Sequence, residues 1–351
     1  MNQTTETLFK LIRVAIKNED DIASSCTVNW QDVYEMSMKQ GVGAIACDGL
    51  LSLSECDIDE ELRYKWMGQS LVIEKKYAKQ KQSIESLVAF YQQHGIRVMI
   101  LKGYGLSLNY PVPQHRPAGD IDIILFGDKV KSDELVEGEL GIKVKKSYEK
   151  HSSFVFRGVT VENHSAFFDI HSHPSNKYVN DRLFQLIEGR TESAIVGKSC
   201  FEIPDPTLMA LHLLRHTACD FAANSISLRQ VLDWALLVHR RGRNMDWSVI
   251  ESFVCETGMW QFYTMINTFC RNRLYIDDLP HSNDSLDNED RFLEDILNGK
   301  RVSDFPLPSN KIVYGIEKSF QFWQNRWKYR MVYNDSLPKL YISNAINRLK
   351  H

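Results

Sequence analysis

The chain has 351 residues, of which 43% are hydrophobic, 25% charged and 11% aromatic. This composition is typical of a globular protein and excludes a disordered, collagen-like or coiled-coil chain. Its 42 Lys and Arg against 45 Asp and Glu give a formal charge of -3, so the general basic character of a nucleic-acid-binding protein is missing. The 7 cysteines are scattered and form no CxxC pair, which disfavours a disulfide framework or a structural zinc site.

Nothing in the sequence predicts a membrane span. The apolar runs fall short of the roughly 18 residues that a spanning helix needs. Near the start, the apolar stretch is interrupted by Lys10, Arg13 and Lys17, and it has no small-residue cleavage site, so it is expected to be an amphipathic helix. We therefore expect a soluble, cytoplasmic protein.

Both ends of the chain show helical periodicity. Apolar residues recur at helical spacing over residues 8–16 and 71–93, and Asn29 is the expected N-cap of a helix between them. The spacing returns after Pro206 and continues into an aromatic tail over 320–333.

The middle of the chain changes to the pattern of strands. Its short runs are rich in β-branched and aromatic residues and are bounded by glycine and proline. Two of them are joined by Arg157-Gly158, which predicts a tight hairpin turn. The five expected strands cover residues 96–101, 121–126, 153–156, 159–162 and 166–171.

The order of these elements predicts an α+β fold with a small mixed β-sheet between two helical parts. The length is about twice that of one average domain, which favours more than one unit. We expect an N-terminal helical region over 1–70, an α/β core over 71–200 and a C-terminal helical domain over 201–351.

Two acidic residues follow Gly119 at the start of the second expected strand. Asp120 and Asp122 are two positions apart, so on a strand their side chains point to the same face. Neighbouring carboxylates repel each other unless a cation lies between them, and Mg²⁺ takes such oxygen ligands while leaving positions for phosphate. Metal ions held in this way offset charge at the attacking and leaving oxygens of a nucleotidyl transfer. The alternative is a solvated acidic pair at a strand end.

Residues upstream of this pair suit a phosphate group. Lys102 and Gly103 follow the first expected strand, where a helix should begin, and amide groups at a helix N-terminus bind anions. Arg116 lies four positions before Asp120 and offers a fork-shaped donor to the same anion. Each feature has a structural alternative, because turns often need glycine and a single surface cation is usually solvated.

The segment LKGYGLSLNYPVPQHRPAGDIDIIL resembles the signature of the uncharacterised nucleotidyltransferase family, within the DNA-polymerase-β-like superfamily. The LKG turn of that family matches Leu101-Lys102-Gly103, and its Tyr-Pro pair matches Tyr110-Pro111. Its arginine matches Arg116, and its D-[IL]-D strand matches Asp120-Ile121-Asp122. Lys102-Gly103 stands where the superfamily usually has Gly-Gly or Gly-Ser. The likeness covers roughly residues 25–250 and implies the mixed-sheet nucleotidyltransferase core.

The resemblance also implies a cofactor and site residues. Asp120 and Asp122 would hold Mg²⁺ (or Mn²⁺), and Lys102, Gly103 and Arg116 would bind the nucleotide. A third carboxylate, serving as metal ligand or general base, is expected from the hairpin strand, where Glu162 matches the pattern of the family. Its competitor is Asp169 in the next apolar run, which has the same acid-x-His spacing.

Several other polar residues are expected near the substrate. His164, His171, Arg215 and Arg229 are candidates for lining the substrate cleft. A zinc site built from the histidines at 164, 171 and 173 is disfavoured, because HxH alone is weak evidence and no cysteine lies nearby.

The function implied is the metal-dependent transfer of an NMP from an NTP to an acceptor hydroxyl, with release of pyrophosphate. The acceptor would be a small molecule, a sugar or a protein side chain; a long nucleic acid is disfavoured because the sequence shows no extended basic face. The alternative is a non-catalytic nucleotide-binding module that uses the same cleft to regulate a partner protein, as an antitoxin does.

Overall fold

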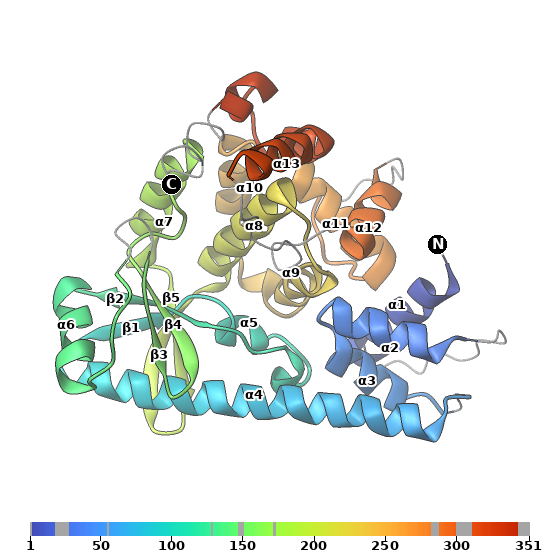
Figure 1. Cartoon of the computed structure of the whole chain (residues 1–351), viewed down its shortest axis with the longest axis horizontal. Helices are drawn as coiled ribbons and strands as arrows, with labels where there is room; N and C mark the ends of the chain where they lie inside the picture. Colours follow the sequence, from blue (N-terminus) through green and yellow to red (C-terminus); the bar gives the residue numbers. More distant parts are fainter. Residues whose placement is uncertain are drawn as a thin grey trace.

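The computed structural model of the chain describes residues 2–17, 28–54, 56–127, 129–146, 151–170, 173–281, 288–299 and 311–342. Helices occupy both ends of the chain, and a six-stranded sheet lies between them in sequence (Figure 1). The α+β class expected from the sequence is confirmed. The helices are α1 (Gln3–Lys17), α2 (Trp30–Lys39), α3 (Gly43–Leu51), α4 (Glu60–Gln93), α5 (Tyr104–Ser107), α6 (Lys129–Glu139), α7 (Ser175–Ile187), α8 (Pro206–Ala223), α9 (Leu228–Arg241), α10 (Trp247–Glu256), α11 (Trp260–Leu274), α12 (Glu289–Asn298), α13 (Lys311–Gln324) and α14 (Arg326–Val332), with the 3-10 turns η1 (Pro113–His115) and η2 (Gly242–Asn244).

The strands form one mixed sheet in the order β3-β4-β2-β1-β6-β5. In the centre, β1 pairs antiparallel with β2 and parallel with β6, and β2 pairs parallel with β4. The hairpins β3–β4 and β5–β6 form the two edges. The strands are β1 (Arg97–Ile100), β2 (Ile121–Phe126), β3 (His151–Phe156), β4 (Val159–His164), β5 (Thr191–Val196) and β6 (Ser199–Pro204).

The long helix α4 connects the sheet to the N-terminal helices. It has 34 residues and runs along the bottom of Figure 1, beneath the sheet at one end and beside α3 at the other. The His115 imidazole lies between the Asp48 carboxylate of α3, at 2.6 Å from Nδ1, and the Glu74 carboxylate of α4, at 2.9 Å from Nε2. Burial disfavours the charged imidazolium, but the hydrogen bonds and charges of these two acids outweigh burial and raise the pKa of His115. This triad therefore fastens η1, the turn that leads toward β2, to two helices.

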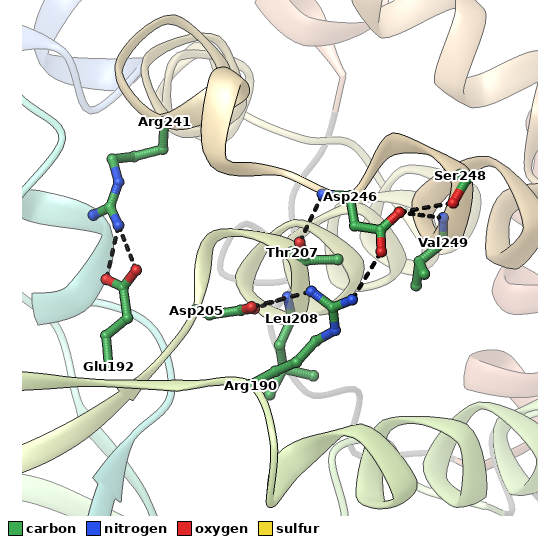
Figure 2. A network of polar contacts seen from close by, with 9 residues as sticks. All are labelled: Arg190, Glu192, Asp205, Thr207, Leu208, Arg241, Asp246, Ser248 and Val249. Atoms are coloured by element: carbon green, nitrogen blue, oxygen red, sulfur yellow. Dashed lines mark hydrogen bonds and ion pairs between the residues drawn. The ribbon is translucent and has the colours of Figure 1, made fainter.

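A polar network fastens the C-terminal helices to the outer edge of the sheet (Figure 2). The Arg190 side chain, just before β5, binds Asp205, the N-cap of α8, at 3.2 Å, and Asp246, the N-cap of α10, at 2.9 Å. At the end of α9, Arg241 binds Glu192 of β5 at 2.6 Å. The network thereby links α8, α9 and α10 to the β5–β6 hairpin and helps to set how α8 and α9 face the sheet.

One of the five expected strands is wrong. The described residues 166–170 form no strand, and His171 lies outside the described residues. The backbone N–H of Phe168 donates to Asn180 Oδ1 at 2.9 Å, and its carbonyl accepts from Asn180 Nδ2 at 2.7 Å. A side chain of α7 therefore satisfies the backbone groups that a neighbouring strand would otherwise pair.

The structure adds elements that the sequence analysis did not predict. The strands β5 and β6 complete the sheet, and α4 begins at Glu60, well before the expected helix over 71–93. The other four expected strands are confirmed within two residues at each end. The division at residues 70 and 200 stays a prediction; α4 runs through the first position and β6 through the second. Within the described part of the chain, no helix is both long and apolar enough to cross a membrane.

Candidate functional site

A pocket of about 290 Å³ opens between the sheet and the helices α8 and α9. One wall comes from the turn after β1 and from the neighbouring parts of β2 and β4, and the other wall comes from the two helices. The lining residues are Leu101, Lys102, Gly103, Leu106, Arg116, Gly119, Asp120, Asp122, Glu162, Met209, His212, Leu213, His216, Thr217, Arg229, Gln230 and Asp233.

Three carboxylates lie on the strand wall. Asp120 immediately precedes β2, Asp122 lies within β2, and Glu162 is the partner of Asp122 in the parallel β2–β4 register. Partial burial raises the pKa of Asp120, and the negative charges of Glu162 and Asp122 raise it further. The three acids therefore disfavour one another's ionised form, and a divalent cation would relieve this repulsion. Their oxygen atoms fit Mg²⁺ or Mn²⁺.

The buried Asp122 carboxylate is held in its ionised form by neighbouring cationic and hydrogen-bonding groups. Its Oδ1 lies 3.3 Å from Lys102 Nζ and 2.9 Å from His164 Nε2. Burial alone would raise the pKa of Asp122, but Lys102 and His164 outweigh it and hold the pKa well below its usual range. The His164 imidazole also lies 3.3 Å from Glu162 and, by this hydrogen bond, lowers the pKa of that carboxyl.

Lys102 and Gly103 form the turn after β1. Gly103 has a φ of +59°, in the left-handed region that favours glycine, and it is the N-cap of α5, a helix of only 4 residues. A Cβ added to Gly103 would lie 3.6 Å from the carbonyl oxygen of Asp120, so the turn runs close to the loop that carries the acids. Lys102 Nζ also lies 3.2 Å from His216 Nε2 of α8, so Lys102 connects the two walls.

Arg116 lines the pocket, but two of its guanidinium nitrogens donate hydrogen bonds to Asp233. Arg116 Nε lies 2.8 Å from Asp233 Oδ1, and Nη2 lies 2.9 Å from Oδ2. The Tyr110 hydroxyl donates to the same Oδ1 at 2.8 Å. Burial disfavours the Arg116 charge, but Asp233 outweighs burial and raises the pKa of the guanidinium. The Tyr-Pro pair and the arginine of the sequence signature thus meet at one carboxylate of α9.

The helix wall carries polar residues of both α8 and α9. His212 is buried, with its ring edge-on to Phe167 and Phe168, and burial lowers its pKa well below the usual value. His216 lies 3.1 Å from Asp220. On α9, burial and the nearby Arg116 lower the pKa of Arg229.

Among the described residues, three of the expected site residues do not line the pocket: Asp169, Arg215 and His164. Asp169 lies beyond the end of β4, where its backbone carbonyl accepts from Asn176 Nδ2 at 2.8 Å. Arg215 is fully buried and donates to Ser175 Oγ at 2.6 Å and to Asn176 Oδ1 at 2.8 Å. His171 lies outside the described residues. His164 reaches the site through Asp122 and Glu162 without lining the pocket itself.

Other residues near the site were missed by the sequence analysis. Gln80 of α4 donates to the carbonyl of Gly119 at 2.9 Å and so supports the loop before β2. His151 of β3 lies 3.6 Å from Glu162. The second residue was detectable, because a two-residue turn at Arg157-Gly158 pairs position 151 with 164 across the hairpin. Gln80 lies in a long amphipathic helix, where no pattern distinguishes it.

Comparison with known proteins gives two matches. Among solved structures, the chain is similar to an antigenic nucleotidyltransferase-like protein from Paracoccidioides brasiliensis, with 14% sequence identity, a TM-score of 0.32 and an overlap of 45% of this chain and 74% of that chain. No curated protein matches. The model of the family described as uncharacterised nucleotidyltransferase matches residues 27–274. This range includes the Lys102-Gly103 turn, all three carboxylates and both helices of the opposite wall. The chain therefore belongs to this family.

Proposed function

We propose that the protein transfers a nucleoside monophosphate from an NTP to the hydroxyl group of an acceptor. The observation that carries this proposal is the convergence of Asp120, Asp122 and Glu162 at one pocket, with Lys102 beside them. Carboxylates next to a cationic group are what a metal-bound polyphosphate requires, because the acids bind the metal and the cation binds the phosphate oxygens. Membership of the nucleotidyltransferase family supports the same reaction class.

The proposed reaction is an in-line displacement at the α-phosphorus. The acceptor oxygen forms a bond to phosphorus while the bond to the bridging oxygen of pyrophosphate breaks, and the acceptor proton passes to a carboxylate. Glu162 is the proposed base or third metal ligand, and Asp169 is its competitor. Mg²⁺ (or Mn²⁺), held by Asp120, Asp122 and Glu162, supplies charge neutralisation at the phosphates when bound.

The nucleotide is proposed to enter with its triphosphate toward the turn after β1. Lys102 would bind the outer phosphates, and the backbone of Gly103 would approach them closely, because this residue has no side chain. Arg116 is proposed to add positive charge at the same end. Its pairing with Asp233 leaves Nη1 as the guanidinium nitrogen that is not bound to that carboxylate.

The acceptor is proposed to be a small molecule, a sugar or a protein side chain. A pocket of about 290 Å³ holds part of a nucleotide together with a compact acceptor group. The net charge of -3 disfavours a long nucleic acid.

The test is release of pyrophosphate from Mg²⁺-ATP or Mg²⁺-GTP in the presence of pooled acceptors. Asp120→Asn and Asp122→Asn should each abolish metal-dependent nucleotide binding or transfer while the fold is retained, and Asp181→Asn, an exposed acid on α7, is the matched control. If both site variants kept wild-type affinity and activity, the site assignment would be wrong. Tight NTP binding without turnover across broad pools would favour the non-catalytic module.

A further inference from the structure

A cluster of two histidines and one glutamate adjoins the pocket and includes Glu162, one of the three carboxylates. The β3–β4 hairpin pairs His151 with His164, and Glu162 lies two residues before His164 on the same strand. His151 Nε2 is 3.6 Å from Glu162 Oε1, and His164 Nε2 is 3.3 Å from Glu162 Oε2. One ligand atom from each of the three residues lies within 4.8 Å of the others.

The contacts of His164 orient its ring for binding a metal ion. Its Nδ1 lies 3.3 Å from the carbonyl oxygen of Ala166, and a carbonyl only accepts, so Nδ1 carries a hydrogen. Its other ring nitrogen, Nε2, points into the cluster, 2.9 Å from Asp122 Oδ1 and 3.3 Å from Glu162 Oε2. A backbone carbonyl bound to the other ring nitrogen is the usual arrangement of a histidine that ligates a metal.

The spacing and chemistry of the ligand atoms fit a transition-metal ion. Around a tetrahedral Zn²⁺ with bonds of about 2.0–2.2 Å, neighbouring ligand atoms lie roughly 3.3–3.6 Å apart. Glu162 Oε2 lies 3.3 Å from His164 Nε2, and Glu162 Oε1 lies 3.6 Å from His151 Nε2, so each carboxylate oxygen is at this spacing from one imidazole. Imidazole nitrogens favour zinc and its neighbours in the first transition row, whereas Mg²⁺ prefers a shell of oxygen atoms. The side chains of His151 and Glu162 are 28% and 23% exposed, which gives an ion a path from solvent and a position for a further ligand.

We propose that His151, Glu162 and His164 bind a transition-metal ion, with Zn²⁺ as the reference ion, at a site separate from the one assigned to Mg²⁺. Glu162 belongs to both sites. The bound ion would fix the Glu162 carboxylate beside Asp122. This binding does not depend on the transfer reaction and is measured without nucleotide.

The experiment uses the full chain after removal of metal with a chelator. Co²⁺ is added as a spectroscopic probe and then displaced with Zn²⁺, while Mg²⁺ serves as the competing oxygen-seeking ion. We expect one equivalent of Co²⁺ with visible absorption of a nitrogen-ligated site, displacement by stoichiometric Zn²⁺, and no displacement by a large excess of Mg²⁺. His151→Gln should weaken Zn²⁺ binding by at least about 100-fold, since loss of even an outer partner of a ligand costs about 10–100-fold.

The matched control is His94→Gln. His94 is also paired with one glutamate, Glu139, at 3.1 Å, and its side chain is 25% exposed. Thermal unfolding of the metal-free variants checks that both remain folded, and the rise in melting temperature on adding Zn²⁺ gives a second measure of binding. Equal Zn²⁺ affinity of the wild type and His151→Gln, absence of Co²⁺ binding, or displacement by Mg²⁺ at matched concentration would each overturn the proposal.

Discussion

Breaking the pair between Arg116 and Asp233 should destabilise the protein more than most single substitutions. The two side chains are 7% and 2% exposed, and two hydrogen bonds of 2.8 and 2.9 Å join them. Removing one partner leaves the other charge buried without compensation, which costs about 3–5 kcal/mol in comparable sites. We therefore expect Arg116→Met and Asp233→Leu each to lower the free energy of unfolding by about this amount.

The double variant Arg116→Met/Asp233→Leu provides the decisive comparison. It removes both charges, so the main remaining loss is the hydrogen bond that the buried Tyr110 hydroxyl makes to Asp233, with a cost of about 1–3 kcal/mol. The double variant should therefore be more stable than either single variant. Urea unfolding with a common m-value measures all three free energies. Singles that lose less than about 1 kcal/mol, or a double variant as unstable as the sum of the singles, would refute a buried and coupled pair.

The same variants separate two roles of Arg116. If its main task is to hold α9 against the loop before β2, Arg116→Lys should lose stability because lysine cannot bind a carboxylate through two parallel hydrogen bonds. If its main task is to bind the triphosphate, Arg116→Lys should weaken NTP binding with little loss of stability. Nucleotide titration and urea unfolding of this one variant distinguish these outcomes.

His115→Gln should lower the free energy of unfolding below a pH of about 6.5, because the protonated ring is the form that its two acids stabilise. The loss should shrink as the pH rises through the raised pKa of the wild-type histidine. Urea midpoints across pH measure it, and a loss that grows with pH would contradict this prediction. Lys102→Ala should weaken NTP more than NMP in equilibrium titrations, and equal losses would remove this residue from the outer phosphates. Gly49→Ala should destabilise, because its Cβ would lie 1.9 Å from the carbonyl oxygen of Leu11, whereas Gly68→Ala, with open space around its Cβ, should stabilise by about 0.5–1 kcal/mol; thermal unfolding of the pair tests the contrast.

The sequence predicted those strands whose apolar residues are dense. Residues 121–126 carry five buried side chains in six positions, and such a run is recognised without knowledge of its neighbours. The strand β5 was missed because its pattern is diluted: Ala194 and Val196 face the core, while the apolar Ile195 is 72% exposed. The opposite error occurred at Phe167 and Phe168, where dense apolar residues suggested a strand but Asn180 takes the backbone hydrogen bonds. The spacing of apolar residues shows which side chains are buried, but it does not show which groups form hydrogen bonds with the backbone.

Some residues of the site could be predicted from the sequence, and others depend on how the helices pack against the sheet. Lys102, Gly103 and Asp120 lie close together in one short segment, and local spacing is enough to select them as candidates. The residues that α8 and α9 bring to the opposite wall depend on how those helices dock, which the Arg190 network and the buried Asp233 pair help to determine. Arg215 illustrates the limit, because it lies on α8 together with His212 but donates to Ser175 and Asn176.

The choice between Glu162 and Asp169 depends on strand register, which the sequence constrains only in part. The two-residue turn at Arg157-Gly158 fixes how β3 and β4 pair, but it does not say which strand lies on the other side of β4. The parallel pairing of β2 with β4 supplies this missing relation and sets Glu162 beside Asp122. The strand then ends at His164, and the chain turns toward α7 before it reaches Asp169. The residue before Asp169 is held by two hydrogen bonds between Phe168 and Asn180, each with a net stabilisation of about 0.5–1.5 kcal/mol. Glu162 lines the pocket and Asp169 does not, so Glu162→Gln should impair transfer more than Asp169→Asn, and the reverse order would assign the role to Asp169.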